Sequence, residues 1–168
     1  MRLSTLALAT SALWLCGCSS QAKNELRTYN MGERVELGSL SYNVFESQWL
    51  TQLGDGPTAR LPEHRFFLVR LSIVNSGAAG AAVPTMTLID DTGKSYSELT
   101  DGDRVPNWIG FLRDVKPGDS LQGQVVFDAP PARYKLRVSG DSERRQALVD
   151  IPLTFGSDTP EVPLPQPR

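Results

Sequence analysis

The fold of this chain is set by one stretch at residues 65–75, which reads Arg65-Phe66-Phe67-Leu68-Val69-Arg70-Leu71-Ser72-Ile73-Val74-Asn75. Side chains of a β-strand point alternately to its two faces, so this stretch predicts a strand with two different faces. The face that we expect in the core carries Phe67, Val69, Leu71 and Ile73. The opposite face carries Phe66, Leu68, Arg70, Ser72 and Val74.

Shorter alternating stretches recur on both sides of this strand. They lie at residues 35–37, 40–45, 86–90, 95–96, 121–127, 134–138 and 149–155, and residues 111–112 predict one more short strand. Turn-forming residues separate them, as in Asp91-Thr92-Gly93-Lys94, which predicts a hairpin. Pro152 should place the last strand at a sheet edge or on a bulge. The pattern predicts an all-β, immunoglobulin-like antiparallel β-sandwich of about seven to nine strands.

Two long irregular segments, at residues 46–63 and 99–110, interrupt the predicted strands. Long loops in compact domains are usually functional or disordered. Both segments contain large apolar side chains, namely Trp49, Leu50 and Leu53 in the first and Val105, Trp108 and Ile109 in the second. Two interpretations stay open, because tryptophan is enriched at interaction hot spots and a large ring can equally cap the open end of a sandwich. These six residues are therefore candidates for contact with a partner.

The N-terminus has the three parts of a secretion signal: a positive start at Met1-Arg2, an apolar run over residues 3–15, and a small residue before a cysteine. The run is too short to cross a bilayer, which takes roughly 20 residues. Leu15-Cys16-Gly17-Cys18 resembles the bacterial lipobox. The resemblance implies cleavage before Cys18 and attachment of acyl chains, such as palmitate, to that cysteine. An ordinary signal cut at Ala7-Leu8-Ala9 is the alternative, but this pattern lies inside the apolar run.

Composition divides the chain into four parts. Residues 1–17 are the expected lipoprotein signal peptide, residues 18–31 the lipidated Cys18 with a flexible tether, residues 32–155 the sandwich, and residues 156–168 a Pro-rich disordered tail. Stable membrane anchoring takes two acyl chains or more. Ser19 follows the cysteine, and in Gram-negative lipoproteins a residue other than aspartate there resembles the outer-membrane sorting signal. We therefore expect a lipid-anchored protein of the cell envelope, at the outer membrane if the source is Gram-negative, facing the periplasm or the cell surface.

Charge and cysteine content exclude two further features. The formal net charge is -2, and it becomes -3 when Arg2 leaves with the signal peptide, so no basic excess points to nucleic acid as a partner. Cys16 leaves with the signal and Cys18 is acylated, so we expect no disulfide in the mature fold. Its stability must come from an ordinary hydrophobic core.

Three stretches in order resemble a known family. They are the strand at residues 66–75, Leu88-Ile89-Asp90-Asp91-Thr92-Gly93-Lys94-Ser95-Tyr96, and Pro117-Gly118-Asp119-Ser120-Leu121-Gln122-Gly123-Gln124-Val125-Val126-Phe127-Asp128-Ala129-Pro130. Over roughly residues 32–153, they are similar to the telokin-like, immunoprotective-extracellular immunoglobulin-like domains of bacterial secreted proteins and lipoproteins. The resemblance implies an immunoglobulin-like fold. It says little about function, because the family is largely uncharacterised and has no catalytic motif to carry over. The loop at residues 49–63 departs from the family pattern, so a surface specific to this protein could lie there.

Residue types suited to catalysis or to metal binding are sparse. His64 is the single histidine, and no thiol remains in the mature chain to build a nucleophilic site. We expect no enzyme activity, no cofactor and no zinc or copper site. Calcium could take oxygen ligands from carboxylates in two turns, although turns favour Asp and Gly for their geometry alone. These carboxylates belong to Asp90, Asp91, Asp101 and Asp103.

Anchor, tether and sandwich together predict a lipid-anchored binding or adaptor module that engages another protein or an envelope component. Its expected partners are the membrane, through the lipid at Cys18, and an envelope protein still to be identified. The alternative is a carrier of a small ligand, or of a cation such as calcium, in a loop-lined pocket. A deep pocket with converging polar groups would favour that alternative.

Overall fold

Alternating stretches of the sequence become strands along most of the chain. The structure, a computed structural model, describes residues 26–142 and 144–153. The predicted signal peptide, Cys18 and the predicted Pro-rich tail lie outside these residues. The described strands are β1 (Arg27–Asn30), β2 (Arg34–Leu37), β3 (Leu40–Leu50), β4 (Phe66–Asn75), β5 (Ala81–Val83), β6 (Thr87–Asp90), β7 (Ser95–Ser97), β8 (Arg113–Val115), β9 (Ser120–Asp128), β10 (Tyr134–Ser139) and β11 (Gln146–Ile151). A short 3-10 helix, η1 (Gly56–Thr58), lies between β3 and β4.

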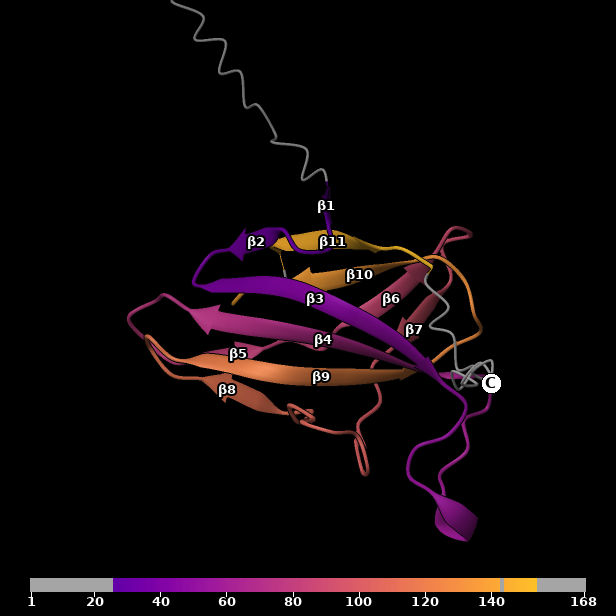
Figure 1. The fold of residues 1–168 in the computed structure, drawn as a ribbon. Coiled ribbons are helices and arrows are strands. Elements are labelled where there is room, and N and C mark those ends of the chain that lie inside the picture. The colour runs from indigo at the N-terminus through magenta and orange to yellow at the C-terminus, as the bar shows by residue number, and fades with distance from the viewer. Residues whose placement is uncertain (1–25, 143, 154–168) are drawn as a thin grey trace, which may run out of the picture.

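Two sheets face each other and enclose the main core (Figure 1). The first, called sheet A, has the strand order β1-β11-β10-β6-β7, and the second, called sheet B, has the order β2-β3-β4-β9. The strands β5 and β8 pair with each other. The predicted all-β, immunoglobulin-like sandwich is thereby confirmed.

The strand β4 lies inside sheet B, between β3 and β9. The predicted core face is confirmed, because its four residues are no more than 2% exposed and lie between the sheets: Phe67, Val69, Leu71 and Ile73. The opposite face is divided. Phe66 and Leu68 are also buried, in a second apolar cluster, whereas Arg70 is exposed. Sheet B therefore carries apolar side chains on its outer face as well as on its inner face.

The strand β3 continues to Leu50, although the sequence predicted an irregular loop from residue 46. The cause is a β-bulge, at which the register with β4 shifts between Val44 and Glu46. A bulge adds one residue to a strand, so the side-chain alternation changes parity there. Phe45 and Glu46 are both exposed, and Trp49 turns into the core. Strict alternation from Val44 would have placed Trp49 outside.

The N-terminal boundary of the sandwich lies earlier than predicted. Residues 27–30 form β1, so the predicted tether at residues 18–31 is wrong over this part. The strand β1 pairs in parallel with β11, which also corrects the purely antiparallel arrangement. The sequence did not predict β1, because this strand is mostly polar and only its Tyr29 packs against the core.

The C-terminal strand also differs from the prediction. The strand β11 is paired on both sides, by β1 and by β10, so it is not an edge strand. It ends at Ile151, directly before Pro152. The proline therefore removes no hydrogen bond from the sheet, which is the physical reason that it does not force β11 to an edge.

The number of strands exceeds the predicted seven to nine because two short strands carry no clear alternation. They are β1 and β5, the latter in a run of Gly and Ala. The short strand predicted at residues 111–112 begins instead at Arg113, and Leu112 is 92% exposed. The hairpin predicted at residues 91–94 is confirmed by the antiparallel pairing of β6 with β7.

A buried ion pair joins the segment after β7 to β8. Arg113 Nη2 donates to both carboxylate oxygens of Glu98, at 2.8 and 2.9 Å, and the two side chains are 3% and 1% exposed. Glu98 Oε1 also accepts the Met86 N–H at 2.9 Å, and Arg113 Nη1 donates to the Gly110 carbonyl oxygen. Burial raises the pKa of the Glu98 carboxyl, and the Arg113 guanidinium opposes this rise. The pair fixes both ends of the loop at residues 99–112.

The same loop covers the free edge of β9. Gln124 exchanges two backbone hydrogen bonds with it, since its N–H donates to the Asn107 oxygen at 2.9 Å and its oxygen accepts the Ile109 N–H at 3.2 Å. This approach requires glycine at position 123, because a Cβ there would lie 2.0 Å from the Asn107 carbonyl oxygen. An uncovered edge would offer unpaired backbone groups to another chain. The loop thus closes this part of the sheet.

The substitution Glu98→Gln keeps the size of the side chain but leaves Arg113 buried without a counter-charge. We expect the free energy of unfolding to fall by about 3–5 kcal/mol, since a buried charge that loses its partner is strongly destabilising. Urea unfolding followed by tryptophan fluorescence measures the change. The control Glu36→Gln breaks the exposed pair with Arg34, at 3.1 Å, and should cost less than about 1 kcal/mol. Equal losses in the two variants would contradict a special role for the buried pair.

The substitution Gly123→Ala should push the loop away from β9. The added methyl group overlaps the Asn107 carbonyl oxygen, so we expect a loss of about 1–3 kcal/mol in stability. Hydrogen exchange should accelerate at the amides of Gln124 and Ile109. Gly80→Ala is the matched control, because nothing lies within 4 Å of a Cβ at that position. Unchanged exchange at both amides in Gly123→Ala would show that this contact does not hold the loop.

Candidate functional site

The outer face of sheet B has a covered apolar half and an open polar half. Leu53 and Val105, one from each long loop, cover the apolar half. They pack against three residues of sheet B: Phe66, Leu68 and Val126. The polar half lies beside this cluster on β3, β4 and β9, and no apolar cluster of the described residues covers it. We take the open half as the candidate functional site.

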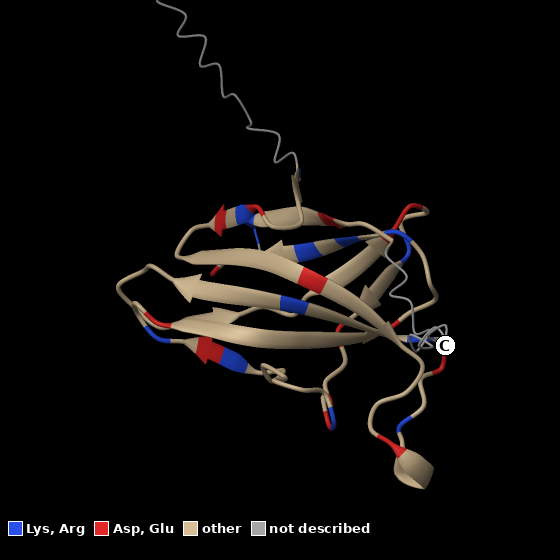
Figure 2. Cartoon of the chain, in the orientation of Figure 1, with Lys and Arg blue, Asp and Glu red and all other residues tan. Residues whose placement is uncertain are grey.

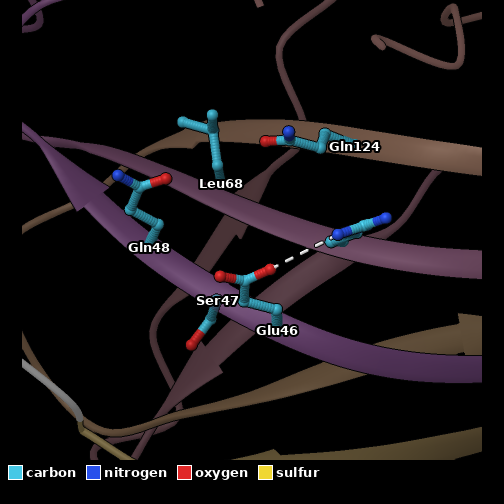
Figure 3. Close-up of a pocket in the computed structure, with 6 residues that line it drawn as sticks. Glu46, Ser47, Gln48, Leu68 and Gln124 are labelled. Atoms are coloured by element: carbon cyan, nitrogen blue, oxygen red, sulfur yellow. Dashed lines mark ion pairs between the residues drawn. The ribbon is translucent and has the colours of Figure 1, made fainter. Parts of the chain in front are cut away.

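A shallow groove of about 380 Å³ crosses the open half. It is lined by Glu46, Arg70, Asn107, Gln122, Gly123 and Gln124. A smaller hollow of about 20 Å³ adjoins it and reaches Gln48 and Leu68. Figure 3 shows Glu46, Gln48, Leu68 and Gln124 on one side of the ribbon, while Ser47 points the other way. The groove is therefore a surface feature laid across three strands of one sheet.

The bulge in β3 supplies one wall of the groove. It turns Glu46 outward, opposite Arg70 of β4. Glu46 Oε2 lies 3.7 Å from Arg70 Nη1, and the two side chains are 65% and 52% exposed (Figure 3). An exposed pair of this kind contributes little to stability, because water competes with it. Both groups therefore remain available to a partner, and together they carry no net charge.

The loop at residues 99–110 and β9 supply the other wall. Asn107 reaches the groove because the loop is hydrogen-bonded to the edge of β9 at Gln124. The side-chain amides of Asn107, Gln122 and Gln124 each offer donors and an acceptor. The groove is thus suited to recognise polar groups by hydrogen bonds.

The six apolar residues predicted to contact a partner lie mostly in the interior. Trp49 and Ile109 belong to the main core, Leu53 and Val105 to the second cluster, and Leu50 and Trp108 are half-buried against that cluster. The Trp49 ring packs on Phe67 with centroids 4.3 Å apart. A buried side chain presents little surface to a partner, which argues against contact by the four buried residues Trp49, Leu53, Val105 and Ile109. For the half-buried Leu50 and Trp108, contact with a partner stays a prediction. Of the two open interpretations, the structure favours the one in which they cap the sandwich.

Two of the four carboxylates considered for calcium, those of Asp90 and Asp101, accept hydrogen bonds within the turns in which they lie. Asp90 Oδ1 accepts the Thr92 hydroxyl at 2.6 Å and the N–H groups of Thr92 and Lys94 at 2.9 Å each. The hydrogen bond from the Thr92 hydroxyl, more than the others, holds the pKa of Asp90 below its usual value. Asp101 Oδ1 accepts the Asp103 N–H at 2.9 Å. Asp91 is exposed, and no group of three or more potential metal ligands occurs among the described residues.

His64 lies at the entry to β4 and is exposed. Asp128 Oδ1 accepts the His64 N–H at 2.9 Å and lies 3.6 Å from its Nδ1. Asp128 Oδ2 accepts the Glu63 N–H at 2.6 Å. These contacts fasten the end of the first long loop to β9.

Sequence reasoning did not single out the residues of the groove. Alternation places Arg70, Gln122 and Gln124 on an outer face. The alternating pattern does not distinguish a face that only contacts water from a face that binds a partner. Glu46 depends on the bulge, and Asn107 on a loop that crosses β9. The available signal is Gly123, because a glycine inside a strand often marks the close approach of another backbone.

Cys18 and the predicted lipobox lie outside the described residues. Within residues 26–142 and 144–153, no helix is long and apolar enough to cross a membrane.

Three solved structures share the architecture of this chain. The yjhA protein from Bacillus subtilis has a TM-score of 0.58 at 14% identity, over 74% of this chain and 99% of its own. MPT63, a secreted protein from Mycobacterium tuberculosis, has a TM-score of 0.52 at 13% identity, over 74% and 95%. A candidate lipoprotein, ycdA from Bacillus subtilis, has a TM-score of 0.52 at 14% identity, over 71% of this chain and 38% of its own. At these identities the likeness shows the fold alone.

Comparison of the sequence with curated proteins gave no match. Residues 29–144 match the family described as a domain of unknown function, DUF4352. The match runs from β1 to the turn before β11, so it includes strands of both sheets and the candidate site. The chain belongs to the DUF4352 family.

Proposed function

We propose that this chain is a lipid-anchored binding or adaptor module of the cell envelope, which engages another protein or an envelope component without catalysis. The observation that carries the proposal is the open groove on sheet B. Gln122, Gln124 and the exposed Glu46–Arg70 pair stand on the sheet, and Asn107 reaches the groove from the loop beside β9. Such a surface can hydrogen-bond a polar partner laid across it. The groove, rather than the buried Trp49, is the proposed contact surface.

The anchor part of the proposal rests on the lipobox at residues 15–18. The structural neighbours are compatible with it, since one is described as a candidate lipoprotein and another as a secreted protein. We further propose that the domain is one of the telokin-like, immunoprotective-extracellular immunoglobulin-like domains, and that its address in a Gram-negative source is the outer membrane.

A carrier of a small ligand or of a cation is the second candidate. The groove volume falls in the range of small-molecule sites, which is roughly 300–1,000 Å³. Such sites bury most of the ligand surface among apolar side chains. This groove is shallow and is lined by polar residues and a glycine. Its shape therefore favours recognition of a surface over enclosure of a small molecule.

Replacing Cys18 by serine should release the protein from the membrane, because the thiol that takes the acyl chains is lost. Fractionation of cells that export the variant measures the release. Cys16→Ser is the matched control, since it also removes a thiol from the lipobox but leaves the acylated position intact. A Cys18→Ser protein that is exported and still sediments with membranes like the wild type would refute the anchor.

A photo-crosslinker at Gln122 or Gln48 should give an adduct of discrete mass in the intact envelope. Both side chains are exposed at the groove or the adjoining hollow. The same crosslinker at Lys116, in the turn before β9, should give none. We expect Arg70→Ala to reduce the adduct several-fold while changing stability by less than about 1 kcal/mol, since the Glu46–Arg70 pair is exposed. Equal adduct yields from Gln122 and Lys116 would count against the groove as the binding surface.

A further inference from the structure

The outer face of sheet A differs in charge from that of sheet B. Along β10, Tyr134, Leu136 and Val138 are buried, so the alternate residues point outward. Lys135 is exposed and Arg137 is half-buried. Arg133, directly before β10, is also exposed. Figure 2 shows these basic positions following one another along β10 and the segment before it.

The neighbours of these side chains leave the face positive. Lys135 lies between Ile89 of β6 and Asp150 of β11, and Arg137 lies between Thr87 and Leu148. Asp150 forms an ion pair with Arg133, at 3.8 Å. Neither Lys135 nor Arg137 forms an ion pair with another described residue.

Among the described residues of β10, β11 and the segment before β10, the charged side chains of this face are Arg133, Lys135, Arg137 and Asp150 and sum to +2, whereas the whole chain carries -2. The outer face of sheet A around β10 is therefore positive, although the whole chain is negative. On sheet B, by contrast, the exposed charges are paired as Arg34–Glu36 and Glu46–Arg70. The two outer faces of the sandwich thus differ in their attraction to a negatively charged surface.

The chain leaves this face on a short connection to Cys18. The strand β1 is the edge strand of sheet A, two strands away from β10. At a spacing of about 4.8 Å between strands, this places β10 about 10 Å from β1. Seven residues lie between Cys18 and Leu26, and the eight Cα-to-Cα steps from one to the other reach about 26–29 Å at most in an extended chain. The reach is long enough for sheet A to lie on the surface that holds the lipid, and short enough to keep the domain beside it.

We propose that the face of sheet A around β10 docks on an anionic lipid surface next to the anchor. The proposal rests on the lipid anchor of the proposed function. Each Lys or Arg near an anionic membrane strengthens attachment about fivefold. Ile89 and Leu148 flank the basic side chains and are half-buried. Because neither is fully exposed, the basic groups can approach the lipid headgroups closely. The groove of sheet B then points away from the membrane, because it lies on the opposite face of the sandwich.

The test uses the full chain, purified with its lipid from bacterial membranes and reconstituted into vesicles. The vesicles consist of phosphatidylcholine alone or of phosphatidylcholine mixed with phosphatidylglycerol, each with a nitroxide-headgroup lipid as quencher. A fluorophore is attached at Ser95→Cys, which is exposed on the outer face of sheet A, or at Gln122→Cys on sheet B. In the anionic vesicles we expect quenching at Ser95→Cys to exceed quenching at Gln122→Cys several-fold. The difference should vanish in neutral vesicles and in molar salt, where charges are screened within about 3 Å.

Charge variants assign the effect to β10. Lys135→Gln with Arg137→Gln should lower the ratio of docked to undocked domain about 25-fold, at about fivefold per residue. Lys135→Arg with Arg137→Lys keeps the charges and should dock like the wild type. Arg34→Gln with Lys116→Gln removes two charges elsewhere and should also dock like the wild type. Because Arg137 is half-buried, Arg133→Gln with Lys135→Gln provides a second test on exposed positions, with loss of docking expected.

The experiment distinguishes failure of the docking face from failure of the lipid anchor. Equal quenching at the two label positions in anionic vesicles, or quenching that ignores lipid charge, would overturn the docking face while leaving the anchor intact. A protein that does not remain with neutral vesicles at all would lack the anchor, and would overturn the proposed function together with the docking that rests on it. Quenching at Gln122→Cys in excess of Ser95→Cys would place the opposite face on the membrane and would also overturn the proposal.

Discussion

The constraint on which the rest of this structure depends is that β4 is apolar on both of its faces. Its inner face forms the centre of the sandwich, but Phe66 and Leu68 point to the outside of sheet B. Leaving such side chains in water would forfeit roughly 1.5–3 kcal/mol each. Two long loops therefore fold across this end of the sheet, and they are joined where Arg60 Nη1 donates to the Asp101 oxygen at 2.9 Å. The backbone of the two loops is irregular. The loops are nevertheless held in place, because their apolar side chains pack in the second apolar cluster.

The way in which this cover is fastened determines the shape of the open half of sheet B. The second loop is held at its ends by the Glu98–Arg113 pair and along its length by β9. Asn107, at its point of contact with β9, has a φ of 51°, a left-handed conformation that asparagine tolerates better than most residues. The side chain that forms one wall of the groove is thus carried by a restrained backbone. Sites on restrained elements keep their geometry better than sites on free loops.

Most of the sandwich, and little of the candidate site, could be predicted from the sequence. Alternation gives the right face of β4 because a two-residue period maps directly onto burial, and the turn residues at positions 91–94 give the β6–β7 hairpin. It fails at β3, where one extra residue reverses the parity and sends Trp49 inward. It also fails at β1, whose position depends on backbone pairing with β11 across the whole chain. The groove combines both difficulties, since it needs the parity change at Glu46 and a contact between Asn107 and Gly123. Gly123 marks the close approach of another backbone, but the sequence does not identify Asn107 as its partner.

A sandwich has two outer faces, and the proposed lipid anchor at Cys18 would make them unequal. If sheet B lay against the membrane, the bilayer would occlude the groove, and a domain held by the proposed anchor on at most about 26–29 Å of chain would have little room to avoid this. The charges favour the arrangement in which sheet A, and not sheet B, faces the membrane. Glu46 and Arg70 cancel each other, so the groove gains nothing from an anionic surface, whereas Lys135 and Arg137 on sheet A have no acidic partner among the described residues. The electrostatic difference between the faces that would turn sheet A toward the lipid is therefore the same difference that keeps the groove open to a polar partner.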